Sequence, residues 1–137
     1  MLPEGNDLRK LFNSNSKEDK RRFKQCASQR IRTGVADCDV WSFDSYLLNV
    51  IIVGLQTLAD NTCSYPGYPP YNTLEKWRTF LLDLADKFLQ AKRYIYLEDN
   101  YNWEHPQEEV NARIEEGYKL LKEAFIELAE HLPSMWD

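Results

Sequence analysis

The sequence predicts an all-α protein, a small helical bundle of three main helices with a shorter basic helix at the N-terminus. Two segments, 73–93 and 106–132, repeat apolar residues every three or four positions, as amphipathic helices do. The segment 40–60 is apolar nearly throughout and lacks proline, so its length favours a helix over a strand. The connections are short enough for antiparallel neighbours, and 137 residues with 43% hydrophobic content suit a single domain.

The first expected elements lie in residues 1–33. Leu8, Leu11 and Phe12 have helical spacing, which fits either a short helix or a frayed end. Ser16 is a plausible N-cap for a basic helix, and Gly34 can adopt the left-handed conformation that ends one.

Charge divides the expected single domain, 1–137, into a basic arm at 1–33 and an acidic helical body at 34–137. Residues 17–32 carry seven cations and two acids, a net charge of +5, whereas 33–137 carries 8 cations and 18 acids, or −10. An acidic body repels a nucleic-acid backbone, so nucleic acid is expected to contact only the arm at 17–32. The arm can equally dock on the acidic helices of its own chain or on an identical neighbour, so an oligomer is compatible with the sequence.

The segment 40–60 is expected at the centre of the bundle, because a helix apolar nearly all round is buried on most sides. Its inward stripe is taken as Phe43, Leu47, Val50, Ile51, Gly54 and Leu58. Three acids precede or open this helix, namely Asp37, Asp39 and Asp44. Capping and dipole interactions explain them better than metal binding, although carboxylates are also the ligands of divalent ions.

Two amphipathic helices complete the bundle. Asn72 followed by Glu75 resembles a capping box that opens the segment 73–93, with a core stripe of Leu74, Trp77, Leu81, Leu84, Ala85 and Phe88. Residues 94–97 either extend this helix or form a short strand. Pro106 favours the start of the last helix, whose stripe is Val110, Ile114, Gly117, Leu121, Ala124, Phe125, Leu128 and Leu132.

Three cysteines without a C-x-x-C pair suggest reduced intracellular thiols and neither a disulfide framework nor a zinc site. The N-terminus lacks a signal-peptide pattern, and the longest uninterrupted apolar run, 50–55, is too short to span a membrane. We therefore expect a cytoplasmic protein that does not associate with membranes.

Aromatic residues are concentrated in the two irregular connections, 61–72 and 94–105. Tyrosine and tryptophan supply contact area at low entropic cost, which is why binding surfaces favour them. They can also simply cover the ends of a bundle, and the sequence leaves both interpretations open. The candidate binding surface is Tyr65, Tyr68, Tyr71, Tyr96, Tyr101 and Trp103.

No complete catalytic motif is present, so a non-enzymatic protein without cofactor or metal is expected. His105 and His131 have no serine or cysteine at a nucleophile motif, and the glycines form no phosphate-binding loop. The enzymatic alternative is a metal-dependent nucleotide hydrolase. It would require the acids near Trp41 to converge with Asp83 and Asp86 or with Glu115 and Glu116, as in all-helical nucleotide pyrophosphatases.

The spacing of acids and aromatics resembles that of a group of small uncharacterised bacteriophage proteins. The pattern covers 32–137 and comprises Gly34-x-x-Asp37-x-Asp39-x-Trp41-x-Phe43-Asp44-x-Tyr46-Leu47, then Tyr68-Pro69, Leu74-x-x-Trp77 and Leu132-x-x-x-Trp136-Asp137. The resemblance implies an accessory protein in the cytoplasm of an infected bacterial host, and it transfers no activity and no site residues.

The leading functional hypothesis is therefore binding to a host protein or defence complex. In this hypothesis the acidic surface acts as a nucleic-acid mimic that inhibits such a target. The alternative is a protein that binds or sequesters a nucleotide or small anion through the tyrosine-rich connections and the basic arm.

Overall fold

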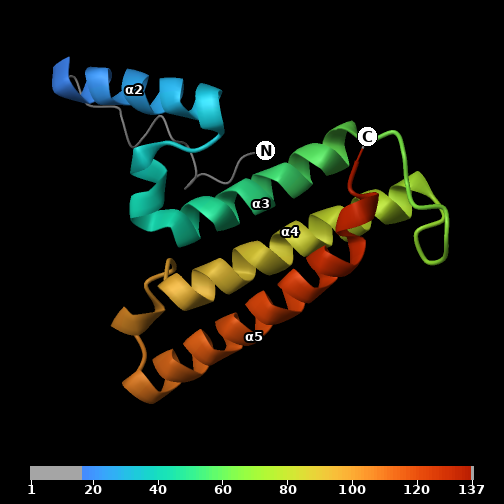
Figure 1. Ribbon diagram of the computed structural model, residues 1–137. Helices are drawn as coiled ribbons and strands as arrows, with labels where there is room; N and C mark the ends of the chain where they lie inside the picture. The colour runs from blue at the N-terminus through green and yellow to red at the C-terminus, as the bar shows by residue number, and fades with distance from the viewer. Residues whose placement is uncertain (1–16, 137) are drawn as a thin grey trace. The chain divides into compact units, whose positions relative to one another are not determined.

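The computed structural model describes residues 17–136, and every regular element in this range is a helix (Figure 1). The helices are α2 (Lys17–Thr33), α3 (Phe43–Asn61), α4 (Leu74–Tyr96) and α5 (Gln107–His131), with short 3₁₀ turns η1 (Asp37–Ser42), η2 (Tyr101–Trp103) and η3 (Leu132–Ser134). The all-α fold class is confirmed. The possible helix around Leu8 and the Ser16 cap lie outside the described residues.

The chain forms two compact units, Met1–Asn49 and Val50–Asp137, called unit 1 and unit 2 below. The boundary lies inside α3, whereas the sequence suggested a division between the basic arm and the acidic body at residue 34. The charge difference persists with the new boundary, because Val50–Asp137 carries 8 basic and 15 acidic side chains, a net charge of −7.

In unit 1 an ion pair joins α2 to η1. The Arg30 guanidinium donates to both carboxylate oxygens of Asp39, at 2.9 and 2.6 Å, and the side chain of Asp39 is only 4% exposed. Asp39 also accepts the backbone N–H of Ala36 at 2.8 Å, which satisfies a donor at the start of η1. Asp39 thus caps η1, whereas the sequence predicted that it caps the apolar helix that follows. Gly34 ends α2 with φ of +81°, as the sequence suggested.

In unit 2, α4 and α5 are antiparallel neighbours (Figure 1). The core stripe of α4 is confirmed at Trp77, Leu81, Leu84, Ala85 and Phe88, all of which are buried. The segment 94–97 extends the helix to Tyr96 and forms no strand. Leu97 then has φ of +52° and ends α4.

Gly117 is the point of closest approach between α4 and α5. A Cβ at this position would lie 2.8 Å from the Cβ of Tyr94 and 3.1 Å from the backbone N of Ile95. Carbon atoms in contact are normally about 3.5–4.0 Å apart, so only glycine fits without a shift of the helices. The two helices therefore pack backbone to backbone at this crossing.

The expected burial of α3 is wrong. Of the stripe assigned from the sequence, Phe43, Leu47 and Val50 are 48%, 39% and 49% exposed. The buried positions are Leu48, Ile52, Leu55 and Ala59, on a different face. A helix that is apolar on almost every side offers no polar face to indicate which side is inward. The most completely buried helix is α4.

Candidate functional site

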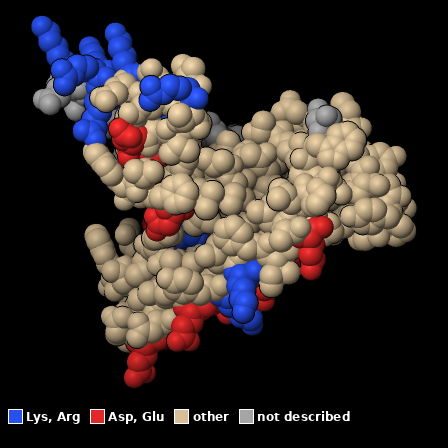
Figure 2. Space-filling model, in the orientation of Figure 1, with Lys and Arg blue, Asp and Glu red and all other residues tan. Residues whose placement is uncertain are grey.

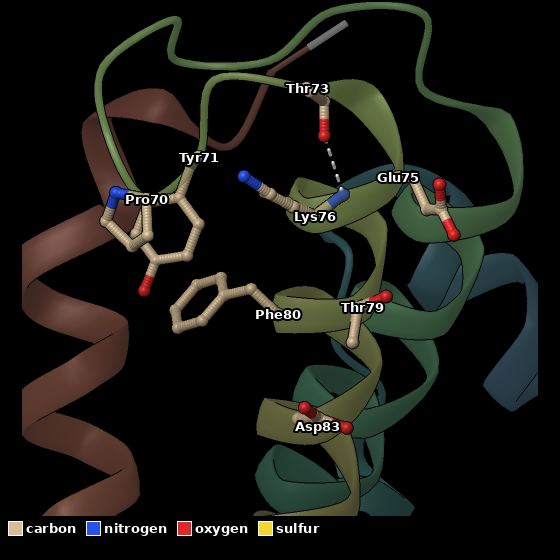
Figure 3. A pocket seen from close by; sticks show the side chains of 8 residues that line it. All are labelled: Pro70, Tyr71, Thr73, Glu75, Lys76, Thr79, Phe80 and Asp83. Atoms are coloured by element: carbon tan, nitrogen blue, oxygen red, sulfur yellow. Dashed lines mark hydrogen bonds between the residues drawn. The ribbon is translucent and has the colours of Figure 1, made fainter.

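Unit 2 has an open pocket of about 650 Å³ at the start of α4 (Figure 3). It lies between the end of the loop 62–73 and the first turns of the helix. Its lining combines aromatic, charged and hydroxyl side chains: Pro70, Tyr71, Thr73, Glu75, Lys76, Thr79, Phe80 and Asp83.

The loop is fixed to α4 by a cap. Thr73 is the N-cap residue, and its hydroxyl oxygen accepts the backbone N–H of Lys76 at 3.2 Å (Figure 3). The sequence placed the cap one residue earlier, at Asn72. The amide oxygen of Asn72 instead accepts from the Lys76 ammonium at 3.3 Å. This geometry turns Tyr71 back towards the first turns of the helix.

Aromatic rings form one wall of the pocket. The rings of Tyr71 and Phe80 have centroids 4.8 Å apart and lie together in Figure 3. Behind them, Trp77 lies 5.5 Å from Tyr71, and His131 lies 5.2 Å from Tyr71 and 4.7 Å from Phe80. Trp77 is completely buried, so the wall is anchored in the core of unit 2. Tyr68 packs against the outer side, 6.3 Å from Tyr71.

Two nitrogen atoms in this ring cluster are buried without a hydrogen-bond partner, namely Nε1 of Trp77 and Nδ1 of His131. Such a group costs about 1–3 kcal/mol in a folded protein. Native structures contain few buried polar atoms without a hydrogen-bond partner, and this ring cluster contains two of them.

The electrostatic surroundings of the wall are acidic. Burial raises the pKa of the Tyr71 phenol, and the nearby carboxylates of Glu127 and Glu130 raise the pKa further. The hydroxyl of Tyr71 therefore keeps its proton at neutral pH and can donate a hydrogen bond. Asp83 and Glu75 add two exposed carboxylates to the rim.

The six aromatic residues expected to form one binding surface lie at two separate ends of the α4–α5 hairpin. Tyr65, Tyr68 and Tyr71 precede α4, whereas Tyr96 ends it and Tyr101 and Trp103 follow. A helix rises 1.5 Å per residue, so the two ends of α4, Leu74 and Tyr96, are separated by roughly 33 Å. The six side chains therefore form no single contiguous patch.

At the far end, Tyr101 is enclosed on both faces. The Arg113 guanidinium lies 3.9 Å from the centroid of its ring, and the His105 ring stacks on it at 3.6 Å. Arg113 also pairs with Asp99 at 2.8 Å and lies over Tyr94. Tyr101 thus stabilises the turn between the helices. Its contacts fit a residue that covers the end of the bundle better than a residue of a binding surface. Trp103 is 80% exposed.

Sequence reasoning did not single out Phe80, and it treated Trp77 only as a core residue. Phe80 follows Trp77 by three residues and lies beside the core stripe of α4, where a half-buried ring packs against the preceding loop. Only the fold brings His131 to these rings, because this residue lies 60 positions after Tyr71 in the sequence.

Two of the acids considered for metal binding, Asp37 and Asp39, are otherwise engaged. Asp39 is held by Arg30 and the Ala36 amide, and Asp37 accepts the side-chain amide of Gln29 at 2.8 Å. Among the side chains that the structure describes, no group of three His, Cys, Asp or Glu residues is arranged to hold a metal ion.

Comparisons of the chain with models of protein families, with curated proteins and with solved structures give no match. By length and composition alone, Asp37–Asn61 is apolar enough to cross a membrane. This is weak evidence, because the core helix of a soluble protein passes the same test.

Proposed function

We propose that the chain is a non-enzymatic binding protein and that the aromatic pocket of unit 2 receives a lysine or arginine side chain from a protein partner. The observation that carries this proposal is the combination of a fixed aromatic wall with a carboxylate rim. The faces of aromatic rings attract cations, and carboxylates strengthen this attraction.

The pocket is preorganised for such a contact. Tyr71 and Phe80 are held by Trp77 and His131 behind them, so little side-chain entropy remains to be lost on binding. Lys76 is the one cation in the lining, and Asn72 already accepts from its ammonium group. A nucleotide or small anion suits this pocket less well, because its lining contains two carboxylates against one ammonium.

The charge of unit 2 favours a basic partner surface. Its net charge of −7 includes exposed acids that are spread along α5, which Figure 2 shows in red. Opposite charge accelerates association and suppresses wrong partners, even where it adds little affinity.

The partner that we propose is a host protein in an infected bacterium, following the resemblance to small phage proteins. Proteins that bind nucleic acid have basic surfaces, so an acidic unit 2 that occupies such a surface would act as a nucleic-acid mimic and an inhibitor.

Affinity purification from bacterial lysate with quantitative mass spectrometry tests the proposal. We expect a specific partner whose retention weakens with salt and is lost in the double variant Glu75→Lys/Asp83→Lys. The matched control is Glu115→Lys/Glu116→Lys, which changes two exposed acids of α5 by the same total charge. Equal retention by both variants, or no specific partner at all, would reject the role of the pocket.

A further inference from the structure

A second surface lies in unit 1, where α2 carries a stripe of cations. Lysine and arginine recur at spacings of three, four and eight residues, which places them on one side of the helix. All members of the stripe are exposed: Lys17, Lys20, Arg21, Lys24 and Arg32. Figure 2 shows the blue side chains gathered over this helix.

Arg30 and Arg22 lie outside the stripe and have different roles. The guanidinium of Arg30 is held by Asp39 at 2.6 Å, so its charge is neutralised inside unit 1. The guanidinium of Arg22 lies 4.1 Å from the ring centroid of Trp41 in η1. The five cations of the stripe have no carboxylate partner among the ion pairs of the described residues.

Trp41 adds an exposed aromatic group to α2, whose own sequence contains one aromatic residue, Phe23. Its ring is 70% exposed although it belongs to a regular turn, and Arg22 fixes its position beside α2. An exposed indole and a row of exposed cations within one small unit are the combination that binds single-stranded nucleic acid. The bases stack on the ring, while lysine and arginine contact the phosphates.

We infer that the corner of unit 1 formed by α2 and Trp41 binds single-stranded nucleic acid without sequence preference. The cation stripe spans 16 residues from Lys17 to Arg32, or roughly 22 Å along the helix axis. This length suits a strand of a few nucleotides, within the range that one stacking platform binds. The inference uses different residues from the pocket of unit 2 and does not depend on it.

A membrane surface is the competing partner for a basic helix. Helices that lie in a bilayer interface have an apolar face flanked by the cations. On the cationic side of α2, Ile31 is the only large apolar side chain, so a phosphate backbone fits this side better than an acyl-chain boundary.

Fluorescence anisotropy of a labelled oligo(dT) of twelve nucleotides tests the inference with the full chain. If four or five cations contact phosphates, affinity should fall roughly 50- to 130-fold between 50 and 200 mM salt. Lys20→Gln/Lys24→Gln should lower the slope of log affinity against log salt by about 1.4. The control Lys119→Gln/Lys122→Gln removes two exposed lysines from α5 and should bind like the parent chain.

The role of Trp41 has its own test. Trp41→Ala should weaken binding at least about fivefold with an unchanged salt slope, because a stacking contact is lost but no phosphate contact. Trp41→Phe should recover part of the loss. Trp103→Ala removes another largely exposed indole, from unit 2, and is the matched control.

The inference would be overturned if the chain does not bind the oligonucleotide at 50 mM salt, or if substitution of the α5 lysines weakens binding as much as substitution of the α2 lysines. It would also be overturned by tighter binding of a duplex of the same length, or by binding of phosphatidylserine vesicles in place of the oligonucleotide. Circular dichroism of each variant establishes that α2 is still folded.

Discussion

Two glycine-to-alanine substitutions in unit 2 should change stability in opposite directions. Gly117 and Gly54 both lie inside helices, where alanine is favoured over glycine by about 1 kcal/mol. Their surroundings differ. A Cβ at Gly54 meets nothing within 4 Å, whereas a Cβ at Gly117 would lie 2.8 Å from Tyr94 Cβ, 2.9 Å from Ile95 Cγ1 and 3.1 Å from Ile95 N.

The contacts at Gly117 cannot be relieved by a side-chain rotation. A Cβ and a backbone nitrogen move only with the main chain of α4, so Gly117→Ala must push the two helices apart. Overpacking of this kind costs about 1–3 kcal/mol, and the upper part of that range applies here. After the gain in helix propensity, we expect a net loss of about 1–2 kcal/mol. Gly54→Ala should gain up to about 1 kcal/mol.

Urea denaturation followed by far-ultraviolet circular dichroism measures both values, and thermal melts should differ in the same order. A net loss of this size in a unit of fewer than 100 residues lowers the melting temperature by roughly 5–15 °C. Gly117→Ala with a stability equal to or above that of the parent chain would refute the close packing of α4 on α5.

Further substitutions test the remaining contacts. Asp39→Asn should cost about 2–3 kcal/mol in unit 1, because it leaves a half-buried guanidinium poorly paired, whereas the exposed Asp37→Asn should cost about 0.5 kcal/mol or less. Burial tends to raise the pKa of Asp39, but the Arg30 and backbone hydrogen bonds outweigh this effect and hold the pKa below its ordinary value. The ionised Asp39 therefore stabilises the folded chain fully at a pH above the pKa of an unfolded aspartate. In an acid titration this contribution should be lost as the pH falls below about 4. Burial, with a hydrogen bond to Cys26, raises the pKa of the Cys38 thiol to about 11. The alkylation rate of Cys38 should therefore still rise about tenfold per pH unit from pH 8 to 10. An alkylation rate that levels off near pH 8.5, as in an unfolded chain, would contradict this. Arg113→Lys should lower the stability of unit 2 by about 1 kcal/mol in urea melts through loss of the stacked guanidinium, while the exposed Arg93→Lys should have almost no effect.

The sequence predicts α4 well and α3 poorly for one physical reason. Charged residues on one side of α4, such as Asp83 and Asp86, indicate which side is buried, and the stripe through Trp77 follows. In α3 nearly every position is apolar, so periodicity identifies a helix but not its inward face. The exposed Phe43 and Val50 could not be distinguished from the buried Ile52 and Leu55 without the fold.

The candidate sites show the limits of local reasoning more clearly. Sequence composition places the aromatic residues in loops, but helix length separates them into two groups at opposite ends of the hairpin. His131 joins Tyr71, and Trp41 joins Arg22, across intervals that no local pattern connects. Both groupings depend on which residues the fold brings together, and each supplies the residue that completes a candidate site.

The central claim is that the pocket at Tyr71 and Phe80 binds a cationic side chain. It is tested most directly by nuclear magnetic resonance titration of the full chain with N-acetyl-arginine amide, with N-acetyl-glutamate amide as the matched control. We expect shifts from the arginine probe at Tyr71, Thr79, Phe80 and Asp83, and no comparable shifts from the glutamate probe. Equal shifts from both probes, or an arginine response centred away from this pocket, would contradict it.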